Sequence, residues 1–122
     1  MTKPRPTSQQ LFHAPGEAIW SPALIATALG LSASEMAYAF NVSESVMRLH
    51  PEDTAIQKKL SSFADVFDRL LDLNPDTAMA VFHTKNTPIR VLGQRTILDL
   101  LRDNESEKIL RYLQTVSGGQ SG

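Results

Sequence analysis

The side chains best suited to binding a partner lie in the segment from Phe82 to Arg102. No acidic residue stands between Asp76 and Asp99, but the segment carries a histidine and three further cations before its end. These residues are His83, Lys85, Arg90 and Arg95. Loops in which cationic and apolar side chains alternate often bind something, although a solvated connection can have the same composition. The residues alone leave both interpretations open.

Residues for catalysis or metal binding do not form a familiar pattern. The three histidines, His13, His50 and His83, include no pair at the three- or four-residue spacing that places two metal ligands on one helix face. There is no Gly-rich phosphate loop, no Gly-x-Ser-x-Gly turn and no cysteine. Asp68 and Asp72 share a charged helix face, where carboxylates are usually solvated. We therefore expect a protein that is not an enzyme and that uses no cofactor or metal.

Two short helices joined by a tight turn are predicted within residues 32–49. The first opens with the capping box Ser32-Ala33-Ser34-Glu35, and the second begins at a serine cap after the turn. Ala37 or Ala39 is small enough to let the helices cross, and Val46 would anchor the second helix. This spacing predicts a helix-turn-helix.

DNA contact by this unit would depend on the early residues of its second helix. These residues are Ser43, Glu44, Ser45 and Arg48. Only one of them is basic and the glutamate would repel phosphate, so a structural helix pair or a dimer surface is an open alternative. The whole chain has a net charge of −1, which argues against non-specific coating of nucleic acid.

The remaining elements are also predicted to be helical, so the expected fold class is all-α. Four regions are predicted: a flexible arm over 1–20, the helix-turn-helix unit over 21–50, a second helical domain over 51–117, and a flexible tail over 118–122. The second domain opens with a long amphipathic helix over 52–73, in which apolar residues recur at three- and four-residue steps. Asn74-Pro75 is predicted to start a short helix, 84–96 to be irregular, Thr96 or Arg95 to start another helix, and Ser106 to cap the last one.

The composition is that of a folded protein of one domain's size. The chain has 122 residues, of which 42% are hydrophobic and 20% charged. The absence of cysteine is compatible with a reducing compartment. No apolar run approaches the roughly 20 residues that span a bilayer, and no leader is recognised. The expectation is a cytoplasmic protein without membrane contact.

The second half of the chain has Asn86, Gly93 and Arg95 in its loop, Asp99-Leu100-Leu101 in the helix that follows, a polar break and a last amphipathic helix. With these features it resembles the C-terminal toxin-binding domain of the Xre/MbcA/ParS-type antitoxins. The helix pair upstream is similar to the N-terminal half of these proteins, so the resemblance covers about residues 24–118. The chain departs from the family at Ile97, where a proline is common, and in a longer loop over 87–91.

The resemblance implies an antitoxin of a type II toxin–antitoxin system. Such a protein occludes the active site of a RES-domain toxin, which degrades NAD or uses it to modify a target. The toxin-binding residues that it implies are Asn86, Arg90, Gly93, Arg95, Asp99, Leu100, Leu101, Arg102, Leu113, Gly118 and Gly119.

Within this set, Arg95 is expected to hold a carboxylate of the toxin bidentately, and Leu100 or Leu101 to be a partly exposed anchor. The helix end from Leu113 through Gly118-Gly119 is expected to enter the toxin's cleft. The protein would also form homo-oligomers or hetero-oligomers with the toxin and bind operator DNA mainly as the complex. The alternative function is a helix-turn-helix transcriptional regulator without a toxin partner.

Overall fold

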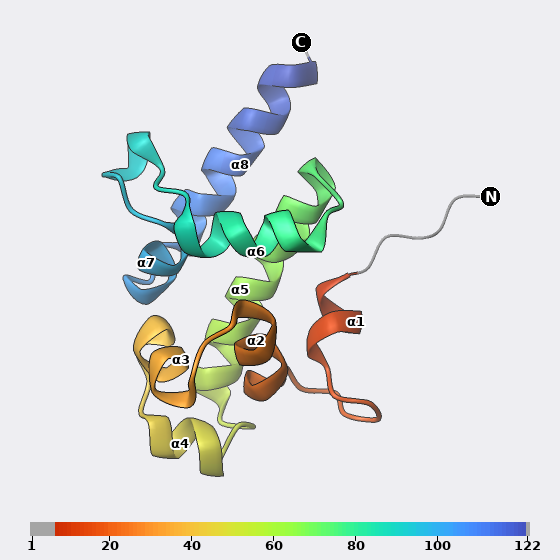
Figure 1. The fold of residues 1–122 in the computed structure, drawn as a ribbon, viewed down its shortest axis with the longest axis vertical. Coiled ribbons are helices and arrows are strands. Elements are labelled where there is room, and N and C mark those ends of the chain that lie inside the picture. Colours follow the sequence, from red (N-terminus) through yellow and green to blue (C-terminus); the bar gives the residue numbers. More distant parts are fainter. Residues whose placement is uncertain (1–6, 122) are drawn as a thin grey trace, which may run out of the picture.

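The computed structural model describes residues 7–121, with the side chains of the last helix described as far as Val116. The α-helices are α1 (Ser8–Phe12), α2 (Pro22–Leu29), α3 (Ala33–Phe40), α4 (Glu44–Leu49), α5 (Thr54–Leu73), α6 (Thr77–Asn86), α7 (Ile97–Arg102) and α8 (Ser106–Ser121), and η1 (Arg90–Leu92) is a 3₁₀ turn (Figure 1). No strand occurs in this part of the chain, so the predicted all-α class is confirmed.

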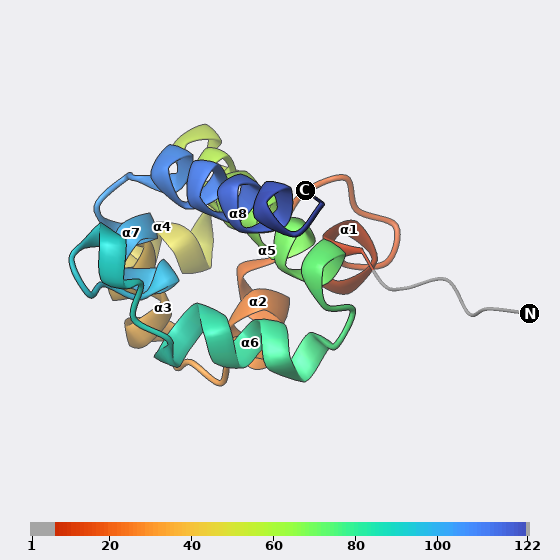
Figure 2. The same ribbon diagram turned by 90° about the horizontal axis from the view of Figure 1, so that it is seen from above.

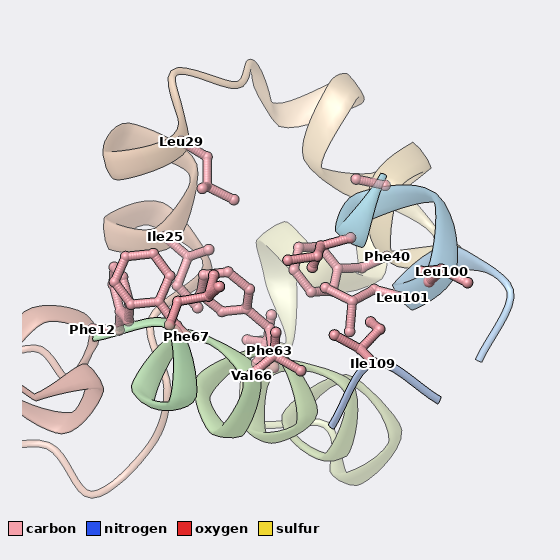
Figure 3. Close-up of a cluster of buried hydrophobic side chains, with 14 of the residues drawn as sticks. Phe12, Ile25, Leu29, Phe40, Phe63, Val66, Phe67, Leu100, Leu101 and Ile109 are labelled. Carbon is pink, nitrogen blue, oxygen red and sulfur yellow. The ribbon is translucent and has the colours of Figure 1, made fainter. Parts of the chain in front are cut away.

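The long helix α5 is the element around which the others pack. Seen from above, α8 lies along one side of α5, while α6 crosses α2 on another side (Figure 2). The predicted amphipathic pattern is confirmed, because the apolar residues of α5 from Ile56 to Leu71 are buried and form the centre of one core. Phe63 lies at that centre, with its ring centroid 5.4 Å from that of Phe12 and 5.9 Å from that of Phe40 (Figure 3). Asp53 caps the helix, so α5 begins two residues later than predicted.

The caps predicted for α2, α3 and α4 are all present. The hydroxyls of Ser21, Ser32 and Ser43 accept hydrogen bonds from amides in the first turn of the helix that each precedes. Asn41 ends α3 in the left-handed region with φ 55°, where asparagine is tolerated better than most residues. The turn that follows sets α4 against α3.

One residue in this helix pair was predicted wrongly. Val46 was expected to anchor the second helix, but Met47 is the buried residue of α4, with 6% of its surface exposed, whereas Val46 is 37% exposed. Ala37 and Ala39 are both buried, as expected for small residues at a helix crossing.

The prediction of a flexible arm over 1–20 is wrong for its described part. Thr7 and Gln10 form a capping box that opens α1. The backbone N–H and the hydroxyl of Ser8 donate to the Asp68 carboxylate at 2.8 and 2.6 Å. The expectation that Asp68 is only solvated is therefore wrong. Phe12 is 1% exposed, and its burial attaches α1 to α5. Residues 1–6 lie outside the described part of the chain.

The second half differs from the prediction in the ends of α6 and α8. Asp76, not Asn74, caps α6, and the helix continues to Asn86 rather than ending near Phe82. Ser106 is the first residue of the last helix rather than its cap, and the helix continues to Ser121, so it includes residues 118–121 of the predicted tail.

Among the described residues, no single helix is long and apolar enough to cross a membrane. Only α2 and α3 together reach that length and composition, and they are bent by 101°.

Candidate functional site

The outward face of α6 carries two exposed apolar side chains, Met79 and Phe82, and the Phe82 ring centroid lies 6.0 Å from that of His83. Ala80 and Thr84 are buried four residues apart and define the inward face of the helix. Met79, Phe82 and Asn86 follow at i, i+3 and i+7, which places them together on the opposite face. Met79 is 38% exposed and Phe82 is 52% exposed. Asn86 was predicted in a loop but closes α6 as its last residue, on the same side as Phe82.

The loop after α6 presents Arg90 and Val91 to solvent. Val91 is 74% exposed, although the loop around it is held in place. The amide of Ile89 donates to the Arg95 carbonyl at 2.9 Å, and the side chain of Ile89 is buried. Gly93 ends η1 with φ 79°, a conformation that a residue with a side chain rarely adopts. Val91 is therefore displayed by an ordered turn.

Arg95 has an internal role in this loop. Its Nε donates to the Leu92 carbonyl at 3.0 Å, and its Nη1 donates to the Asp103 carboxylate at 3.0 Å and to that of Glu105. The hydrogen bond to Asp103 raises the pKa of Arg95, and the bond to Glu105 acts in the same direction. The hydrogen bond from Lys108 lowers the pKa of Glu105, and Arg95 contributes to the same effect. A guanidinium that makes these intramolecular hydrogen bonds is not free for the bidentate contact expected with a carboxylate of the toxin.

The expected leucine anchors are buried. Leu100 is 0% exposed and Leu101 is 6% exposed, so the expectation that one of them is partly exposed is wrong. Leu113 is also 6% exposed and packs in the core, so it is not free to enter a toxin's cleft. Burying these side chains is what attaches α7 and α8 to the rest of the fold.

Asp99 and Arg102 also make intramolecular contacts. The Asp99 carboxylate accepts from the backbone N–H of Thr96 at 2.9 Å and completes the capping box of α7. The guanidinium carbon of Arg102 lies 3.9 Å from the centre of the Tyr38 ring, and its Nη1 donates to the Tyr38 carbonyl. Gly118 and Gly119 lie within α8, but their surroundings are outside the described residues.

The residues predicted to face DNA are together on α4. Ser43, Glu44, Ser45 and Arg48 are all exposed. The hydroxyl of Ser43 caps the helix, and it lies 3.0 Å from that of Ser45. Leu49, which the sequence did not single out, adds an apolar side chain that is 63% exposed.

Sequence reasoning also missed Met79, Phe82 and Val91 as surface residues. The sequence does contain a signal for Met79 and Phe82. If the helix is extended to Asn86, its repeat places Ala80 and Thr84 on one face and Met79 and Phe82 on the other. The exposure of Val91 depends on tertiary contacts of its loop and had no local signal.

The described residues do not form a preorganised metal site. They contain no group of three or more His, Cys, Asp or Glu side chains that could hold a metal ion. His83 instead pairs with Thr87 through a 2.9 Å contact between Nδ1 and Oγ1. No protein-family model, curated protein or solved structure matches this chain.

Proposed function

We propose that this protein is the antitoxin of a type II toxin–antitoxin pair, and that the outward face of α6 and the η1 turn bind a RES-domain toxin. The observation that carries the proposal is the exposure of Phe82 and Val91 on two consecutive, well-held elements. Both lie in the segment whose motifs resemble the toxin-binding domain of Xre/MbcA/ParS-type antitoxins. Aromatic residues surrounded by partly polar ones are typical of interface hot spots.

The charge of the segment supports an acidic counterpart on the toxin. Arg90 is exposed next to Val91, and no acidic residue occurs between Asp76 and Asp99. Cationic residues at the rim of an interface speed association with a partner of opposite charge and set its orientation. Under this proposal the protein acts in the cytoplasm, covers the site at which the toxin consumes NAD, and assembles with it as a hetero-oligomer.

The α3–turn–α4 pair is assigned in the same proposal to a helix-turn-helix. Arg48 is the one Lys or Arg side chain on the exposed face of this helix pair. A single copy therefore neutralises few DNA phosphates. Operator binding should therefore be weak for the protein alone and stronger for the toxin complex, which brings several copies together.

The test is co-expression with the proteins encoded by the adjacent genes, among which the proposal expects a RES-domain protein. We expect the two chains to co-purify and cellular NAD to be preserved. Phe82→Ala and Val91→Asp should each weaken the complex by more than about 1 kcal/mol, while leaving the fold intact because both side chains are exposed. Leu24→Ala on α2 is the matched control, since Leu24 is also partly exposed but lies outside the proposed surface.

Two outcomes would contradict the proposal. If no RES-domain protein binds and the chain alone binds the operator tightly, the protein is a helix-turn-helix regulator without a toxin partner. If the toxin binds but both variants retain full affinity, the contact surface is elsewhere on the molecule.

A further inference from the structure

A cavity of about 450 Å³ lies between α2, α3 and α4, and α3 packs against both of the other helices. Figure 1 shows these three helices at the end of the molecule opposite the C-terminal half of α8. None of the residues proposed to contact the toxin borders the cavity. Its volume is within the range of pockets that hold small organic molecules.

Small side chains on one side of α2 leave this space open. Pro22, Ala23 and Ala26 follow one another at i, i+1 and i+4 and line the cavity. Ile25 and Leu29, on a different side of the same helix, are buried in the core. The core therefore holds α2 in place while its small residues leave a hollow towards α4.

The cavity has an apolar interior and a charged mouth. Met36 and Met47 line the interior and are 1% and 6% exposed. Methionine side chains are flexible and polarizable, so such a wall adapts to the shape of an apolar group. The charged residues of the lining, Glu17, Glu44 and Arg48, are all exposed and therefore lie at the mouth. This arrangement suits a ligand with an apolar body and one ionic end.

The charges at the mouth select the sign of that ionic end. Two carboxylates face one guanidinium, and none of the three makes an ion pair within the described residues. A single positive charge on the ligand brings the group to neutrality, and an ammonium donates charge-assisted hydrogen bonds to carboxylates. Because this end of the ligand stays at the mouth, its charge is not removed from water.

We propose that the cavity between α2, α3 and α4 binds a small organic amine with an apolar body, and that this ligand strengthens the contact of α4 with operator DNA. The second part rests on the proposed function, in which α4 faces the operator. Glu44 is the residue of that face that repels phosphate, and a cation bound beside it offsets the repulsion. The coupling is reciprocal, so operator DNA tightens ligand binding by the same factor.

The first experiment is isothermal titration calorimetry on the full chain without toxin or DNA. The probes are diphenylpropylamine and two compounds with the same apolar body, diphenylpropanol and diphenylpropanoic acid. The amine should bind about five-fold more tightly than the alcohol, because solvent-exposed ion pairs are worth up to about 1 kcal/mol each. The acid should bind more weakly than the alcohol, since it meets two carboxylates.

Variants locate the site. Glu17→Gln and Glu44→Gln should each weaken binding of the amine by about three-fold and leave the alcohol unchanged. Glu107→Gln, at an exposed position of α8, is the matched control. Ala23→Phe should weaken the amine and the alcohol alike by about ten-fold or more, because the added ring occupies the cavity, whereas Ala23→Ser should not. Circular dichroism checks the folding of each variant, which we expect to be kept because these side chains are exposed.

The second experiment measures binding of a labelled duplex from upstream of the protein's own gene, with and without saturating amine. The amine should lower the dissociation constant of the duplex by about three-fold, the size expected for one screened surface charge. The effect should disappear in Ala23→Phe, which excludes an action of the amine on the DNA itself. It should also disappear in Glu44→Gln, which has no negative charge to offset.

Three results would overturn the proposal. The site is wrong if none of the probes binds at millimolar concentration, or if Ala23→Phe binds the amine as well as the wild type does. The charge assignment is wrong if the alcohol or the acid binds as tightly as the amine. The regulatory part is wrong if the amine binds in the cavity and duplex affinity stays the same. A chain that binds no duplex at all contradicts the operator assignment instead, and calorimetry still decides the site.

Discussion

Phe12 is predicted to be a stabilising residue of the whole protein, although it lies in a segment expected to be a flexible arm. Its ring is 1% exposed and lies 5.4 Å from the ring of Phe63 and 5.2 Å from that of Phe67, between centroids. Phe12→Ala removes this buried surface and leaves a cavity against α5. Substitutions of this kind cost about 3–5 kcal/mol, and we expect about 3 kcal/mol because a helix of only five residues can partly collapse into the space.

The sole tryptophan makes the prediction measurable. Trp20 follows α1 in the chain, with its ring centroid 4.3 Å from that of His13, and its backbone N–H donates to the Gln57 side chain at 2.8 Å. Urea unfolding should therefore give coincident curves by Trp20 fluorescence and by far-ultraviolet circular dichroism. With a slope of about 2 kcal/mol per molar urea, Phe12→Ala should lower both midpoints by about 1.5 M. Gln9→Ala, at an exposed position of α1, is the control.

The result that refutes this reasoning is a separation of the two probes. If the fluorescence of Trp20 changes at low urea before helicity is lost, and Phe12→Ala leaves the circular dichroism midpoint unchanged, then the segment opens on its own. The cost of the substitution would then be limited by the small free energy of that opening, and α1 would be a loosely attached arm.

Three further predictions concern the C-terminal elements. The pKa of Glu105 is lowered from its ordinary value of 4.5, so the ionised carboxylate stabilises the fold above pH 4.5. This stabilisation is lost as the pH falls through the lowered pKa. The Tm difference between wild type and Glu105→Gln should therefore shrink over that acidic range. Arg95→Ala should weaken toxin binding by more than about 1 kcal/mol and speed amide exchange at Gln94, because the loop loses its brace; weaker binding with unchanged exchange would make Arg95 a direct contact. Deleting 117–122 should leave binding intact and weaken inhibition if the chain end enters the toxin's cleft, whereas full inhibition would assign the blockade to α6 and η1.

The starts of α2, α3 and α4 were predictable because capping is local chemistry. Ser21, Ser32 and Ser43 each precede a helix by one residue, and their hydroxyls satisfy amides that the helix itself leaves unpaired. The long helix α5 was predictable for a different reason, since twenty residues of regular apolar spacing outweigh any single position.

Short elements among prolines were harder to predict. α1 has a capping box at Thr7 and Gln10, but only Leu11 and Phe12 supply apolar residues, which is too few for a periodic pattern. Its helix depends on burying Phe12 against α5 and on the carboxylate of Asp68, which is sixty residues away in the sequence. Contacts at that separation leave no local trace.

The candidate site shows the same limit in its chemistry. Residue type suggested that Arg95 and Leu100 could bind a partner, and residue type cannot tell a free side chain from one already used. The structure shows that Arg95 braces its loop and that Leu100 fills the core.

The motif that resembles the toxin-binding domain is thus largely a folding motif in this chain. Gly93 permits a turn, Asp99 caps α7, and Leu100 is buried, so changing any of them should disturb stability before it disturbs recognition. Residues that select a partner must instead have side chains that are exposed to solvent. Phe82 and Val91 meet that condition, and their substitution should reverse the order, with binding lost while the fold is kept. A recognition surface of this kind can change between relatives while the motif that supports it stays the same, because the two depend on different residues.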